Sequence, residues 1–323
     1  MSTPLELRPA GIRVPASTSN LGAGFDCLGL ALDRSLAATF EPGPGTLRLE
    51  RRGTLETLAT PADDDLLVRT FTERIARAGA QATGVLCAES DIPLARGLGS
   101  SAAAVVAGLA LADEALGREP DRDELLVVAE ALEGHPDNVA PAIFGGLVVT
   151  ARDADGASLP FRLPLSDAIG FAFAAPGHEL STSAARKSLP EQVPLPVATR
   201  GLGRMAALVQ GLATADPKLL SAGFSDDLHV PHRLALIPGG AAALQAAERA
   251  GAWAATISGA GSGLIAACPP ERADDVAAAM AEAFRHAAGP EGVVHFTARP
   301  DTAGLRPLDT AASGVRPLEA EWR

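Results

Sequence analysis

Two short strings in this 323-residue chain combine residue types that could bind a phosphorylated ligand. The first, PLARGLGSSAAA at residues 93–104, places Gly97 and Gly99 directly before two serines and an alanine-rich segment. Glycine adopts backbone conformations closed to other residues, and the free N–H groups at the start of a helix attract anions. The string could form a phosphate-binding loop, but taken by itself it favours a tight turn before a helix that a serine caps.

The second string, EGHPDN at residues 133–138, groups two carboxylates, an imidazole and an amide around a glycine and a proline. Mg²⁺ in proteins takes one or two carboxylates together with phosphate oxygens, so Glu133 and Asp137 could hold a metal beside a hydroxyl nucleophile. Equally, Asp137 and Asn138 could cap the turn while Glu133 is solvated. The pattern alone leaves both interpretations open.

Two further strings are rich in small residues and glycine. Asp26 is the single charged residue in PASTSNLGAGFDCLGL at residues 15–30, where it could meet a cationic ligand group or accept backbone N–H groups in a turn. TISGAGSG at residues 256–263 separates two strand-like runs. That string predicts either a hairpin turn or a close approach of the backbone to an anion.

Composition excludes several classes of function. The net charge is −12, from 27 Lys and Arg against 39 Asp and Glu, and no basic run exceeds two residues, which disfavours nucleic acid and anionic membranes as partners. The two lysines, Lys187 and Lys218, both lie outside glycine-rich strings, which excludes a Walker A loop and the strand lysine of protein kinases. The uncharged segments 97–112 and 251–270 are too short or too interrupted to span a membrane, and three separated cysteines indicate reduced thiols, so we expect a soluble, cytoplasmic protein.

The elements around these strings alternate between strand and helix without a uniform βαβ repeat, which favours an α+β fold of two domains at this length. The runs at residues 11–14, 30–40 and 46–49 predict strands in antiparallel pairing. A soft boundary follows residues 153–156, so the expected domains are 1–155 and 156–323. The other expected strands are 84–90, 146–151, 168–174, 254–258, 263–268 and 293–298, and the expected helices are 66–78, 102–116, 124–133, 200–213, 241–250 and 271–287.

The four strings occur in one order, together with STSAARKSLP at residues 181–190 and HRLALIP at residues 232–238. This ordered set, from about residue 12 to residue 268, resembles the GHMP small-molecule kinases, and among them the members that phosphorylate L-homoserine. The resemblance implies a two-domain GHMP kinase fold, with an N-terminal domain like that of ribosomal protein S5, a C-terminal ferredoxin-like domain and the active site between them.

The resemblance also implies the site residues and the cofactors, ATP and Mg²⁺. Ser101 and Glu133 would hold Mg²⁺, with Glu130 as the alternative ligand. The catalytic group would be His135, Asp137 and Asn138, with Asn138 near the transferred phosphoryl. The residues around the ATP phosphates would be Pro93, Leu94, Ala95, Arg96, Gly97, Leu98, Gly99, Ser100, Ser101, Ala102 and Ala103. The amino-acid site would comprise Asn20, Asp26, His135, Asp137, Thr182, Arg186 and Arg233.

This residue set suits a zwitterion, because arginine binds a carboxylate with a planar fork and Asp26 can bind an ammonium group. The implied reaction is transfer of the ATP γ-phosphoryl to L-homoserine, giving O-phospho-L-homoserine in threonine biosynthesis, by a homodimer. Whether Asp137 acts as a base or only binds substrate stays open, and the rival functions are another GHMP kinase activity or non-catalytic ligand binding. Three features depart from the family pattern: Ser262 replaces a proline, Asp63-Asp64-Asp65 stands where relatives place an asparagine that reaches adenine, and the segment that joins Glu133-Gly134 to His135 is short.

Overall fold

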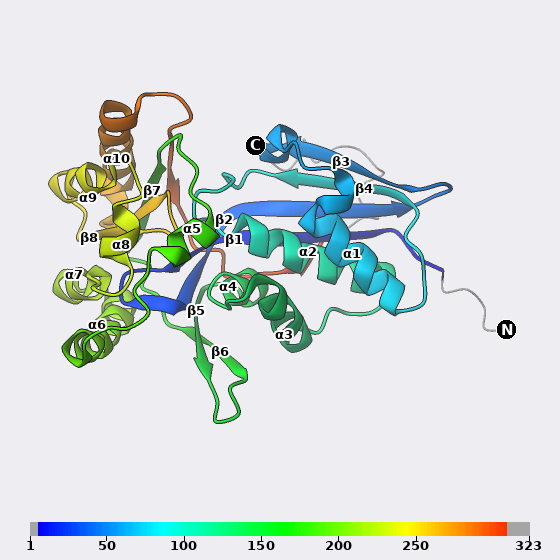
Figure 1. Ribbon diagram of the computed structural model, residues 1–323, viewed down its shortest axis with the longest axis horizontal. Coiled ribbons are helices and arrows are strands. Elements are labelled where there is room, and N and C mark those ends of the chain that lie inside the picture. Colours follow the sequence, from blue (N-terminus) through cyan, green and yellow to red (C-terminus); the bar gives the residue numbers. More distant parts are fainter. Residues whose placement is uncertain (1–5, 309–323) are drawn as a thin grey trace.

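The computed structural model describes residues 6–308, which form two lobes, each built on a β-sheet (Figure 1). Residues 1–5 of the first predicted domain and residues 309–323 of the second therefore lie outside the described part of the chain. The first sheet has the strand order β11-β1-β2-β4-β3, and β5 pairs with both β2 and β6. Its strands are β1 (Ala10–Asn20), β2 (Gly24–Pro42), β3 (Leu47–Gly53), β4 (Gly84–Ser90), β5 (Leu147–Arg152), β6 (Ser158–Leu163) and β11 (Arg306–Pro307).

Four helices lie along one side of the first sheet (Figure 1): α1 (Leu66–Arg77), α2 (Ser100–Ala115), α3 (Arg122–Glu133) and α4 (Val139–Phe144). The expected antiparallel pairing holds for β1 and β2 but is wrong for β3, which pairs in parallel with β4. Parallel neighbours need a crossover connection, and α1 provides it between β3 and β4. Two 3₁₀ turns, Thr54–Thr57 and Ala62–Asp64, lie within this crossover.

The second sheet is antiparallel, in the order β10-β7-β9-β8. Its strands are β7 (Gly170–Ala175), β8 (Ala254–Ile257), β9 (Leu264–Cys268) and β10 (Val294–Ala298). With α9 (Gly240–Arg249) and α10 (Ala273–Ala288), the chain order β7-α9-β8-β9-α10-β10 is that of a ferredoxin-like unit. Between β7 and α9 the chain inserts α5 (Thr182–Lys187), α6 (Leu195–Thr214), α7 (Pro217–Phe224) and α8 (Val230–Leu234), and the 3₁₀ turn Pro270–Arg272 precedes α10.

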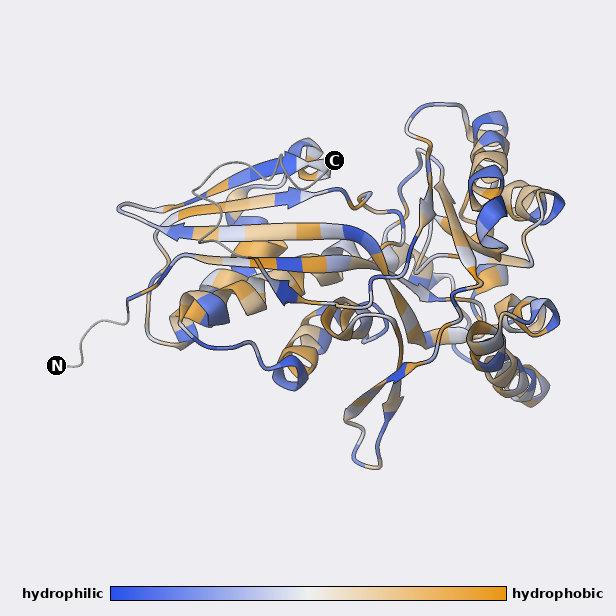
Figure 2. Ribbon diagram, turned by 180° about the vertical axis from the view of Figure 1, so that it is seen from behind, coloured by the Kyte–Doolittle hydropathy of each residue, from blue (hydrophilic) through white to orange (hydrophobic). Residues whose placement is uncertain are grey.

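The apolar core extends from one lobe into the other. Phe171 and Phe173 of β7 belong to the same buried cluster as Leu28 and Leu30 of β2, and Figure 2 shows apolar stretches along the strands of both sheets. The expected domain boundary near residue 155 falls in the turn of the β5–β6 hairpin, so β6 pairs within the first sheet. Within residues 6–308, every helix is too short or too polar to span a lipid bilayer.

Candidate active site

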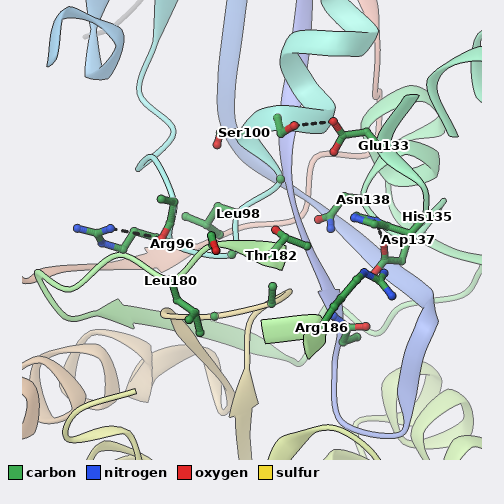
Figure 3. A pocket seen from close by; sticks show the side chains of 18 of the residues that line it. Arg96, Leu98, Ser100, Glu133, His135, Asp137, Asn138, Leu180, Thr182 and Arg186 are labelled. Carbon is green, nitrogen blue, oxygen red and sulfur yellow. Dashed lines mark hydrogen bonds and ion pairs between the residues drawn. The ribbon is translucent and has the colours of Figure 1, made fainter. Parts of the chain in front are cut away.

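A cavity of about 400 Å³ lies between the lobes. Figure 3 shows Glu133, Asn138, His135 and Asp137 along one side of it and Arg96, Leu98 and Leu180 along the other. Most of the predicted site residues line this cavity: Asn20, Asp26, Ala95, Arg96, Gly97, Leu98, Gly99, Ser100, Ser101, Glu133, His135, Asp137, Asn138, Thr182, Arg186 and Arg233. Pro93, Leu94, Ala102 and Ala103 are outside its lining, and the last two are buried in α2 against the core.

The loop that enters α2 is built on left-handed glycines. Gly97 and Gly99 have φ of 72° and 65°, and a Cβ atom on Gly97 would lie 1.9 Å from the carbonyl oxygen of Ser258. No side chain caps α2, so the serine-cap interpretation is wrong; the first bond of the helix runs from the Ala103 N–H to the Gly99 carbonyl. The N–H groups of the first turn and the positive end of the helix dipole therefore face the cavity, which suits phosphate.

Ser101 and Glu133 are hydrogen-bonded to each other in the wall of the cavity. Ser101 Oγ donates a hydrogen bond of 2.5 Å to Glu133 Oε1. Glu133 is the last residue of α3, which ends at Gly134 with φ of 83°. A hydroxyl and one carboxylate fit Mg²⁺, which completes its octahedron with phosphate oxygens and water. Within residues 6–308 no group of three or more acidic, histidine or cysteine side chains could form a cage for a metal by itself.

Glu130, the alternative metal ligand, points elsewhere. Its carboxylate accepts hydrogen bonds from Arg152 and Ser158 at the β5–β6 hairpin, and it is not part of the cavity lining. The two glutamates are one helical turn apart, yet one meets α2 and the other meets the hairpin. The geometry therefore favours Glu133.

His135 and Asp137 form a close pair, with His135 Nδ1 at 2.6 Å from Asp137 Oδ1. Burial by itself lowers the pKa of His135, but the hydrogen bond and the charge of Asp137 outweigh it and raise that pKa above its usual value. Burial likewise raises the pKa of Asp137, and its bond to His135 more than reverses this, so that pKa is lowered. The carboxylate of Asp137 therefore stays ionised although it is only 2% exposed.

Asn138 is fixed by hydroxyl groups that sequence reasoning did not assign to the site. Ser17 Oγ donates to Asn138 Oδ1 at 3.0 Å, and Asn138 Nδ2 donates to Ser19 Oγ at 2.9 Å. On the same strand, Thr18 Oγ1 lies 2.8 Å from Ser258 Oγ. The sequence did carry a signal for these contacts, the run of small hydroxyl residues at 17–19. Hydroxyl groups within a buried strand must find hydrogen-bond partners.

Asp26 and Arg186 come from different lobes and form a two-pronged ion pair, with N–O distances of 2.8 and 3.0 Å. Asp26 therefore meets a cation, while its own N–H donates to Asn20 Oδ1 at 2.9 Å. Thr182 opens α5, the helix that carries Arg186.

Arg233 is 1% exposed yet lines the cavity. Its Nη1 donates to the Gly259 carbonyl at 3.2 Å, and its Nε has no hydrogen-bond partner among the described residues. A buried guanidinium with spare donors is suited to an anionic ligand group.

The second glycine loop, between β8 and β9, supports the first. Ser258 Oγ donates to the Gly97 carbonyl at 2.7 Å, which makes the loop more than a hairpin turn. Ser262, where relatives place proline, is buried and donates to the His178 carbonyl at 2.5 Å, so a hydrogen bond restrains this position. Arg96 turns away from the His135 side of the cavity, as Figure 3 shows, and its Nη2 donates to the Gly177 carbonyl at 2.9 Å.

Asp65 has a local structural role. Its carboxylate accepts the Leu67 N–H at 3.0 Å, which caps α1, and pairs with Arg51 at 2.7 Å. It is not part of the cavity lining.

The comparisons with known proteins agree with this geometry. Two family models match, GHMP kinases N terminal domain at residues 66–146 and GHMP kinases C terminal at residues 208–286. The homoserine kinase of Synechococcus sp. (strain CC9311) is 40% identical over 315 residues, which are 96% of this chain and 96% of that protein. The homoserine kinase of Prochlorococcus marinus (strain MIT 9303) is 38% identical over 277 residues, 84% of this chain and 88% of that protein.

Solved structures give the same grouping. The crystal structure of homoserine kinase from Cytophaga hutchinsonii has a TM-score of 0.80 and 28% identity, and covers 95% of this chain and 100% of that chain. L. major mevalonate kinase has a TM-score of 0.67 at 16% identity, covering 94% and 100%, which shows a shared fold alone. The fold is thus that of the GHMP kinases. Within that superfamily, the chain belongs to the homoserine kinase family, as the sequence resemblance predicted.

Proposed function

We propose that this protein transfers the γ-phosphoryl group of ATP, with Mg²⁺, to the side-chain hydroxyl of L-homoserine, which yields O-phospho-L-homoserine for threonine biosynthesis. The observation that carries the proposal is the meeting of Asp26, Arg186 and Arg233 beside a phosphate-type loop in one cavity. These side chains complement both charges of an amino acid, and the 40% identical relative is named a homoserine kinase.

When bound, Mg·ATP supplies the phosphoryl group and the positive charge that neutralises it during transfer. On the protein side, the N–H groups from Gly97 to Ser101 cradle the phosphates. Ser101 and Glu133 are the metal-facing pair, because their oxygens already meet at 2.5 Å in the cavity wall. Asn138, locked by Ser17 and Ser19, presents its amide beside this pair at a fixed angle.

The amino acid is oriented by charge. Arg186 and Arg233 take the carboxylate and Asp26 takes the ammonium group, which requires the ion pair between Asp26 and Arg186 to open when the substrate binds. Asn20 and Thr182 complete the binding site. The acceptor hydroxyl then lies toward His135 and Asp137. This orientation contributes to the rate by holding the hydroxyl in line with the phosphoryl group.

Asp137 is suited to orient the acceptor hydroxyl. His135 keeps the pKa of Asp137 low, so the carboxylate is ionised at neutral pH and can accept a hydrogen bond from that hydroxyl, although the low pKa makes it a weak base. The protein would work in the cytoplasm as a homodimer. Gel filtration with light scattering measures its oligomeric state directly.

The decisive experiment measures ADP release from Mg·ATP with L-homoserine, mevalonate, galactose, L-serine, L-threonine or no acceptor. Turnover with L-homoserine alone is expected. Turnover with mevalonate or galactose instead would retain a GHMP kinase and overturn the amino-acid assignment. Nucleotide binding without turnover on any acceptor would favour the non-catalytic alternative.

A further inference from the structure

The tip of the β1–β2 hairpin, residues 20–26, carries Asn20 and Asp26 into the active site and has an unusual backbone. Asn20, Leu21 and Asp26 have φ of 71°, 40° and 56°, a region that non-glycine residues seldom adopt. Such a backbone persists only where its surroundings hold it. Contacts from the second lobe must therefore fix the tip.

Helix α7 provides the first of these contacts. The Ala23 N–H donates to the Gly223 carbonyl at 2.9 Å. Gly22 packs so closely on the end of α7 that a Cβ atom there would lie 2.4 Å from the Phe224 carbonyl oxygen. The tip is thus pressed against backbone, which leaves it little freedom on that side.

His229 provides the second contact, from the residue before α8. It is 0% exposed, and its Nε2 lies 3.0 Å from the Gly22 carbonyl oxygen. A carbonyl oxygen can only accept a hydrogen bond, so Nε2 carries the proton of the neutral ring. Nδ1 then has a lone pair and no hydrogen-bond partner among the described residues. Protonating Nδ1 would bury an N–H without a partner, and burial lowers the pKa of His229 more than the Asp226 carboxylate, 3.8 Å from Nε2, raises it, so this imidazole is neutral.

Phe25 connects this histidine to the amino-acid site. Its ring stacks on His229 with centroids 4.9 Å apart and an angle of 17° between the planes. The guanidinium carbon of Arg233 lies 5.0 Å from the centre of the same ring. His229 precedes α8 and Arg233 lies one helical turn later, so the two side chains meet Phe25 from the same side.

We infer that His229 and Phe25 are positioning residues for the amino acid, because they set the place of Asp26 relative to Arg233. Phe25 is the neighbour of Asp26 in sequence and touches Arg233 across the lobes. The inference rests on the proposed function, in which these two charges bind opposite ends of the substrate. The ATP phosphates are held by the loop at residues 97–101, which has no part in this stack.

The test compares four variants with the wild type, once the wild type is shown to phosphorylate L-homoserine. His229→Leu removes the hydrogen bond and the stacked ring, His229→Gln keeps an N–H donor, and Phe25→Leu removes the other ring. Phe71→Leu is the matched control, since Phe71 forms a ring pair with Phe40 at 4.9 Å in the core of the first lobe.

For His229→Leu and Phe25→Leu we expect the KM for L-homoserine to rise by about tenfold, the size of one lost hydrogen bond or ring pair. The KM for ATP and kcat should change by less than about twofold, because the phosphate loop is untouched. His229→Gln should recover part of the loss, and Phe71→Leu should lower Tm without changing the KM for L-homoserine.

An unchanged KM for L-homoserine in Phe25→Leu would overturn the inference, as would an equal rise in both KM values. If His229→Leu does not fold, Phe25→Leu decides alone, because it leaves the bond from His229 to Gly22 in place. A wild type inactive on L-homoserine would instead overturn the proposed function, so the two failures are distinguishable.

Discussion

Replacing Glu133 with glutamine should weaken the use of Mg²⁺, whereas the same change at Glu130 should not. Both substitutions keep the shape of the side chain and remove one negative charge. Glu133 meets Ser101 in the cavity wall, while Glu130 is engaged by Arg152 and Ser158 at the hairpin. The pair of variants therefore separates a metal ligand from a structural carboxylate one helical turn away.

The expected magnitude follows from these contacts. A polar contact with a charged partner contributes about 1.5–3 kcal/mol, which corresponds to about a 10- to 150-fold change in an equilibrium constant. Glu133→Gln should raise the Mg²⁺ concentration for half-maximal activity by a factor in this range. Glu130→Gln loses an ion pair whose arginine side chain is 51% exposed, so solvent screening limits its effect to about 1 kcal/mol of stability.

The assay is ADP release at saturating ATP and L-homoserine with Mg²⁺ varied, and each variant's Tm is measured alongside. A shift in Mg²⁺ dependence for Glu133→Gln, with Tm close to that of the wild type, is the expected result. The reasoning is refuted if Glu130→Gln shifts the Mg²⁺ dependence and Glu133→Gln does not.

Four further outcomes test Arg186 and the His135–Asp137 pair. Arg186→Ala should raise the KM for L-homoserine by about tenfold and leave the KM for ATP unchanged; the expected rise is modest because the Arg186 side chain is partly exposed. A fall in ATP affinity alone would contradict the assignment of Arg186 to the amino-acid site. Asp137→Asn should lower the pKa of His135 in an NMR titration, because the raising charge is gone and burial remains. In the same variant, a loss confined to kcat identifies a base, and a higher KM with kcat kept identifies substrate binding. The His135–Asp137 pair should also make stability depend on pH. Because folding raises the pKa of His135, its contribution to the free energy of unfolding is full below about pH 6.5 and is lost as the pH rises through its pKa in the folded protein. Because folding lowers the pKa of Asp137, its contribution is full above about pH 3.8 and is lost as the pH falls through its pKa in the folded protein. The Tm difference between wild type and His135→Gln should be largest between those limits, and a difference that is constant to pH 9 would contradict the pairing.

Local chemistry was readable from the sequence because each string carries its own constraints. Glycines before an alanine-rich helix predicted the turn that enters α2, and the main helices and strands follow from apolar periodicity within each segment. The short helices α4, α5, α7 and α8 were not predicted, since one or two turns leave too little periodicity to detect. In α5 and α7, a side-chain cap from Ser181 or Asp216 helps to hold such a short helix.

Tertiary structure decided every relation between distant segments. It brought β4 between β2 and β3, directed Glu133 and not Glu130 into the cavity, and gave Asn138 its partners on β1. It also stacked Phe25 on His229, 204 positions later in the chain. The sequence by itself determined which groups could donate, accept or carry charge. The packing of the two lobes determined which of those groups meet, because a side chain's partner is set by whichever element the core brings within a few ångströms of it.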